Sequence, residues 1–116
     1  MAMPHAASGE AIAVQGAAPA PDLTQFSSIA LVRSAELEVI RMTLPKGKAL
    51  PEHHVPGEIT MLCLQGELSI EAHGGSRRLA AGQLMYLNGG QAHALRAEQD
   101  SLMLLTIVLV SPRPAA

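Results

Sequence analysis

Histidines and a carboxylate gather in one short stretch of this 116-residue chain, "PEHHVPGE" at residues 51–58. His53 and His54 are adjacent, and Glu58 follows four positions after His54. Another imidazole, His93, lies in a second stretch, "GQLMYLNGGQAHALRA". Imidazole nitrogens and carboxylate oxygens together bind Zn, Fe, Mn, Ni or Cu, and two imidazoles with one carboxylate suit Fe(II) and oxygen chemistry. Whether these side chains can reach a single ion depends on the elements that carry them.

Composition and charge exclude several classes of function. Phe26 and Tyr86 are the only aromatic residues apart from histidine, so the core must be aliphatic and methionine-rich and offers little for stacking bases or sugars. The net charge is −2, and Arg77 and Arg78 form the only adjacent basic pair. Because no basic surface for a phosphate backbone is expected, nucleic acid is excluded as a predicted partner.

The location is predicted from the single cysteine and from the absence of sorting signals. Cys63 has no second cysteine to pair with, which fits a reducing cytoplasm. Residues 1–22 are rich in Ala, Pro and Gly and lack the basic and apolar regions of a signal peptide. The longest apolar run, residues 101–110, is too short to span a bilayer. A cytoplasmic protein without a membrane partner is expected.

Short apolar runs separated by turn residues begin near residue 29, a pattern typical of an all-β sandwich or barrel. No helical stripe of useful length appears, and the chain is long enough for one hydrophobic core only. Turns are expected where Gly, Pro, Asn or Asp cluster, as in "PKGK", "HGGS" and "NGG". Strands are predicted at residues 29–33, 36–44, 58–64, 67–72, 77–80, 83–87, 92–97 and 101–110.

The last predicted strand, "SLMLLTIVLV", is apolar at odd and even positions alike. Successive side chains of a strand point to opposite faces, so neither face of this strand suits water. A second sheet or a second subunit must cover the other face. The sequence therefore predicts a homodimer.

Two clusters of glycine and histidine resemble the two motifs of the cupin superfamily. The first consists of Gly47, His53 after five intervening residues, and Gly66. The second consists of Gly82, Gly90 and His93. The resemblance implies an all-β, single-domain antiparallel β-barrel of the RmlC-like cupin type, also called a double-stranded β-helix or jelly roll. The Ala/Pro-rich composition of residues 1–24 predicts a flexible arm, which leaves residues 25–116 as the cupin domain.

The resemblance leaves two alignments of the first motif open. If Gly66 sets the register, His53 takes the first ligand position, whereas Val55 and Ile59 replace the second histidine and the glutamate. If the spacing from histidine to glutamate is preserved instead, an irregular backbone near Pro56 lets adjacent histidines converge. In that second alignment one divalent transition metal is held by His53, His54, Glu58 and His93.

Two classes of function follow from these alignments. One is a metal-dependent enzyme acting on a small organic molecule inside the barrel. The other is a metal-free dimeric cupin that binds a small apolar ligand without catalysis. His73, Lys46, Lys48, Arg77 and Arg78 are expected to be solvated loop or hairpin residues. The walls of the cavity are expected to include Ile59, Met61, Cys63, Tyr86 and Leu95.

Overall fold

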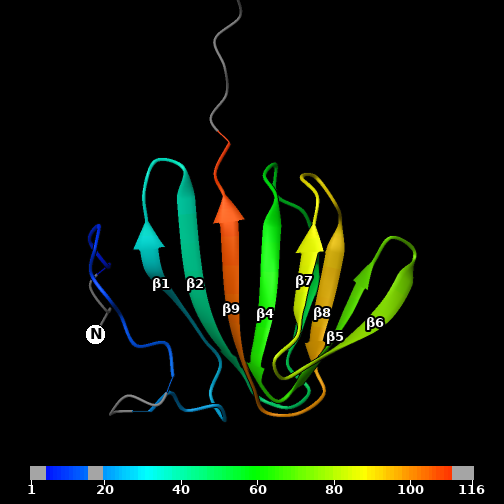
Figure 1. Ribbon diagram of the computed structural model, residues 1–116. Coiled ribbons are helices and arrows are strands. Elements are labelled where there is room, and N and C mark those ends of the chain that lie inside the picture. The colour runs from blue at the N-terminus through cyan, green and yellow to red at the C-terminus, as the bar shows by residue number, and fades with distance from the viewer. Residues whose placement is uncertain (1–4, 16–19, 111–116) are drawn as a thin grey trace, which may run out of the picture.

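The computed structural model describes residues 5–15 and 20–110, and within these ranges the chain forms nine strands and no helix (Figure 1). The predicted all-β fold is confirmed. The strands are β1 (Ser27–Arg33), β2 (Leu37–Leu44), β3 (Ala49–His53), β4 (Ile59–Gln65), β5 (Glu67–Ala72), β6 (Gly75–Ala80), β7 (Leu84–Leu87), β8 (His93–Ala97) and β9 (Ser101–Val108).

The strands form two antiparallel sheets. The first sheet has the order β1-β2-β9-β4-β7, and the second has the order β3-β8-β5-β6. Figure 1 shows the first sheet fanning from β1 to β7, with β8, β5 and β6 beyond it. Strands that follow each other in the chain, β4 and β5 or β6 and β7, belong to different sheets. The chain therefore passes repeatedly between the two layers, as in a jelly roll.

The core lies between the two sheets and follows the alternation of side chains along each strand. In β4, Ile59, Met61 and Cys63 are buried, whereas the intervening Thr60 and Leu62 are only partly buried. The second sheet contributes its own inward rows in the same way. The buried core cluster comprises Leu44, Ile59, Met61, Cys63, Leu68, Ile70, Leu79, Leu87, Leu95, Ala97 and Met103.

β3 is a strand that the sequence pattern did not predict. Its sequence, "ALPEH", has no alternation of apolar and polar residues and contains Pro51. Proline has no N–H for the ladder and is therefore confined in sheets mainly to edge strands. β3 is an edge strand of the second sheet, and its pairing with β8 shifts register between Leu50 and His53. This edge position explains how a proline-containing segment pairs at all.

Two hydrogen bonds join the described N-terminal residues 5–15 to the barrel. The backbone N–H of Ala6 donates to the carbonyl of Leu31 at 2.8 Å, and the side-chain amide of Gln65 donates to that of Gln15 at 3.3 Å. The arm predicted for residues 1–24 includes residues 1–4 and 16–19, which lie outside the described residues. In the described ranges, no helix is long and apolar enough to cross a membrane.

Candidate functional site

The loops that carry the two sequence motifs lie against each other. The backbone N–H of Gly90 donates to the carbonyl of Val55 at 2.8 Å. Gly89 lies so close to the carbonyl of Pro56 that a side chain there would collide with it. Gly90 has a φ of 79°, a conformation that glycine adopts without strain. Contact between these loops brings the start of β8 next to the end of β3.

His53 and His93 come together at this junction. They are Cα partners in the pairing of β3 with β8, and their ring centroids lie 4.4 Å apart with an interplanar angle of 58°. The side chain of His93 is buried, with the residue only 4% exposed, whereas His53 is exposed. The pair therefore extends from the barrel interior to the surface.

Both imidazoles are oriented by the same kind of hydrogen bond. The Nδ1 atom of His53 lies 3.0 Å from the carbonyl oxygen of Pro51, and that of His93 lies 3.0 Å from the carbonyl oxygen of Gln91. A carbonyl oxygen only accepts hydrogen bonds, so Nδ1 carries the proton in both rings. In a neutral imidazole this leaves the Nε2 lone pair free. The site thus presents two Nε2 acceptors on neighbouring rings.

The other two candidate ligands lie elsewhere. His54 and Glu58 are exposed, and the carboxylate of Glu58 lies beside the hydroxyl of Tyr86, whose pKa it raises by hydrogen bonding and by its negative charge. The inward positions nearby are occupied by Val55, which packs against the core, and by the buried Ile59. This placement corresponds to the alignment that Gly66 sets, with apolar residues at two of the four ligand positions.

The donors that the structure brings together do not make a four-ligand metal site. Within residues 5–15 and 20–110, no group of three or more His, Cys, Asp or Glu side chains is arranged to hold an ion. His53 and His93 supply two imidazole nitrogens, half of the set that the cupin motifs imply. Protein sites for transition metals ordinarily use three or four protein ligands.

Most of the predicted cavity-lining residues lie in the packed core. Ile59, Met61, Cys63 and Leu95 are all at most 5% exposed and belong to one buried cluster. Burial raises the pKa of the Cys63 thiol, and the negative charge of Glu67 adds to this effect. Cys63 is therefore a protonated core residue.

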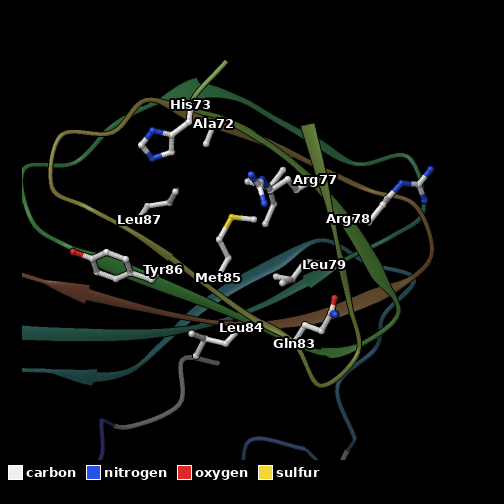
Figure 2. Close-up of a pocket in the computed structure, with 11 residues that line it drawn as sticks. Ala72, His73, Arg77, Arg78, Leu79, Gln83, Leu84, Met85, Tyr86 and Leu87 are labelled. Carbon is white, nitrogen blue, oxygen red and sulfur yellow. The ribbon is translucent and has the colours of Figure 1, made fainter. Parts of the chain in front are cut away.

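A cavity of about 570 Å³ lies between β6 and β7, the adjoining edge strands of the two sheets (Figure 2). Tyr86, which was expected in the wall of the barrel cavity, lines this separate cavity and is 53% exposed. His73, Arg77 and Arg78 also line it and are exposed, as expected. The prediction that Arg77 and Arg78 lie in a loop is wrong, because both belong to β6.

The pattern of the cupin domain family matches residues 40–110, well over half of the chain. The chain belongs to the cupin family. The matched residues run from β2 to the end of β9 and include both histidines of the pair.

Solved structures similar to this chain agree with the jelly-roll fold. A conserved protein of unknown function from Streptococcus pyogenes is 27% identical, with a TM-score of 0.71 over 91% of this chain and 100% of that chain. An RmlC-like cupin from Desulfovibrio desulfuricans is 23% identical, with a TM-score of 0.67 over 91% of this chain and 96% of that one. A cupin superfamily protein from Desulfitobacterium hafniense is also 23% identical, with a TM-score of 0.68 over 75% and 79% of the two chains. No curated protein matches the chain.

Proposed function

We propose that this cupin binds a small organic molecule at the mouth of its barrel, beside His53 and His93, through the two Nε2 acceptors. The observation that carries this proposal is the pair of Nδ1 hydrogen bonds to the carbonyls of Pro51 and Gln91. They fix both tautomers and keep both acceptors available to a ligand that donates hydrogen bonds.

The surroundings of the pair support a ligand that is apolar apart from its donor groups. Ala72 is the Cα partner of His93 on β5, and Leu50 and Leu95 form the next paired row of β3 and β8. All three are apolar and pack in or against the core. Sites for small molecules combine such walls with a few placed polar groups. The ligand would therefore place a hydroxyl or an N–H group on His93 and its carbon skeleton on the aliphatic wall.

A screen of small hydrogen-bond donors by ligand-observed NMR tests this proposal. The panel contains phenols, short diols and lactams, and the variants are His93→Ala, His53→Ala and His5→Ala. His5 is an exposed histidine of the N-terminal segment and serves as the matched control. Compounds that bind the wild type and His5→Ala, but not His93→Ala, would support the proposal. Binding that is unchanged in both His93→Ala and His53→Ala would overturn it.

A metal-dependent activity is the second candidate, and the same hydrogen bonds favour it. Histidines that bind metals nearly always donate their other ring nitrogen to a carbonyl or carboxylate. His53 and His93 both do so, and His53 is open to solvent. A transition metal would supply Lewis acidity or an activated water. The protein would hold such an ion only with further ligands from the solvent or the substrate.

Metal content per chain separates the two candidates. Wild type, His93→Ala, His54→Ala and His5→Ala would be purified without a tag and analysed before and after supply of Fe(II), Mn, Ni, Cu or Zn. A stoichiometric metal that is lost in His93→Ala and kept in His5→Ala would support the metal-dependent candidate. Loss in His54→Ala as well would favour the four-ligand alignment. Failure of every form to retain metal would favour the metal-free candidate.

We also propose that the outer face of the first sheet pairs with a second copy of the chain. This face carries exposed Leu84, Tyr86 and Val108, which are 57%, 53% and 45% exposed. Among the described residues, the buried Nε atom of Arg41 on this face has no hydrogen-bond partner. The exposed carboxylate of Glu58 lies at the same face, next to Tyr86. A two-fold axis would allow the arginine of one copy to meet the glutamate of the other.

A further inference from the structure

The cavity between β6 and β7 has an apolar floor. Ile70, Leu79 and Leu87 line it, and all three are buried residues of the core cluster. Met85 adds a flexible thioether side chain from β7. Neither His53 nor His93 lines this cavity, so it is distinct from the histidine pair.

Arg77 brings a positive charge to this apolar floor. The side chains of Arg77 and Arg78 start on opposite faces of β6, and Arg77 shares its face with the buried Leu79. Its Cα partner on β5 is the buried Ile70. Figure 2 shows the side chain of Arg77 over the middle of the cavity and that of Arg78 at one side, and both residues line the cavity. Arg77 thus lies on the same face of β6 as the apolar floor, whereas Arg78 lies at the edge of the cavity.

The two arginines differ in their partners as well. Arg78 lies 3.2 Å from a carboxylate oxygen of Glu67 and 3.8 Å from one of Glu98. Within the described residues, no carboxylate lies within ion-pair distance of Arg77. An arginine above an apolar surface and without an internal counter-ion can bind an external carboxylate in a bidentate manner.

The lining of the cavity has a net positive character, although the protein is negative overall. No Asp or Glu lines it, whereas Arg77 and Arg78 both do, and His73 lines it from the turn between β5 and β6. Two other cavities of the described chain differ in this respect, because Glu71 lines both of them. This cavity therefore favours an anion with an apolar body over a neutral or cationic compound.

We propose that this cavity binds an aliphatic monocarboxylate, with the carboxylate on the guanidinium of Arg77 and the carbon chain against Ile70, Leu79 and Leu87. This site goes beyond the proposed function, because its ligand class follows from a different pocket and a different polar group. The volume of about 570 Å³ lies within the range of pockets for small organic ligands.

Isothermal titration with octanoate, octanol and octylamine tests the assignment. The variants are Arg77→Gln and Arg77→Lys, with Arg78→Gln as the matched loss of one positive charge on the same strand. Octanoate should bind the wild type more tightly than octanol or octylamine does. Arg77→Gln should weaken octanoate binding about tenfold or more, since it removes a charged hydrogen-bond pair. The affinity of Arg77→Lys for octanoate should lie between those of the wild type and Arg77→Gln, because lysine keeps the charge and loses the bidentate geometry.

The outcomes separate this site from the histidine pair. Octanoate binding that is weakened in Arg77→Gln but retained in Arg78→Gln and His53→Ala would support the assignment. Equal affinities for the three probes, no binding of octanoate, or an Arg77→Gln variant that binds like the wild type would overturn it. Each of these results leaves the proposed function untouched, because the small donors of the NMR screen would still bind in a manner that depends on His53 and His93. Circular dichroism of each variant checks that the barrel is folded.

Discussion

Gly66 lies directly against Ser101 where the chain passes from β4 to β5. A β-carbon at Gly66 would approach the hydroxyl of Ser101 and the carbonyl of Asp100 more closely than real side chains do. The same hydroxyl lies 3.1 Å from the backbone N–H of Glu67, which donates to it. The passage between the two sheets therefore depends on close contact of the backbone at Gly66 and Glu67 with Ser101 and Asp100.

Substitution of Gly66 by alanine should destabilise the protein more than substitution of Gly82. Both glycines have positive φ, 83° and 87°, so each alanine costs about 1–2 kcal/mol for the backbone conformation. Only Gly66 has neighbours within 4 Å of the added β-carbon, which costs about 1–3 kcal/mol more. Urea unfolding of Gly66→Ala and Gly82→Ala measures the difference. Equal losses would mean that Ser101 moves aside freely.

When their rings are neutral, His53 and His93 should both carry the proton on Nδ1. The reason is that each Nδ1 atom lies 3.0 Å from a backbone carbonyl oxygen. Free imidazole favours the other tautomer in water. Long-range ¹H–¹⁵N correlation spectra at alkaline pH distinguish the two nitrogens of each ring. The exposed His5 and His54 serve as internal controls and should show the ordinary tautomer. An Nε2–H signal for His93 would contradict the orientation on which both candidate functions depend.

The free energy of unfolding should decrease at alkaline pH through Cys63. Burial, followed by the charge of Glu67, raises the pKa of this thiol above its ordinary value of 9.0. The unfolded chain then loses the thiol proton at a lower pH than the folded chain, so stability is full below the unfolded pKa and falls as pH rises through it. The difference in unfolding free energy between the wild type and Cys63→Ala, followed from pH 7 to pH 10, reports this loss. A constant difference would contradict it.

A negative charge on the outer face of the first sheet should separate the proposed dimer. Val108→Glu and Leu84→Glu change residues that are exposed in the single chain, so neither should prevent folding. Sedimentation should show a dimer for the wild type and a monomer for these variants. Ser76→Glu, an exposed position on β6 in the other sheet, is the control and should remain dimeric. A wild type that sediments as a monomer would refute the dimer.

Strands with strong alternation or continuous apolar runs could be predicted closely. β5 has the predicted bounds, Glu67–Ala72, and β9 begins at the predicted residue and ends two positions earlier. β3 was missed because an edge strand need not bury a face, so Pro51 and Glu52 leave no hydrophobic pattern to detect.

The candidate site was only partly predictable, since its geometry depends on contacts between distant loops. The closeness of His53 and His93 follows from the pairing of β3 with β8, which no local pattern encodes. Arg77 is different, because a signal was available. It lies two residues before Leu79 on a predicted strand, so alternation alone directs it to the same side as a core leucine.

The two histidines are held with unequal firmness. β8 is paired on both sides, with β3 and β5, whereas β3 is an edge strand interrupted by Pro51. Edge segments with few ladder bonds open locally at a lower free energy than central strands do. Amide protons of β3 should therefore exchange before those of β8. Fraying of this one strand would carry His53 away while His93 stays in the barrel, so the pair can be taken apart and rebuilt without unfolding the domain.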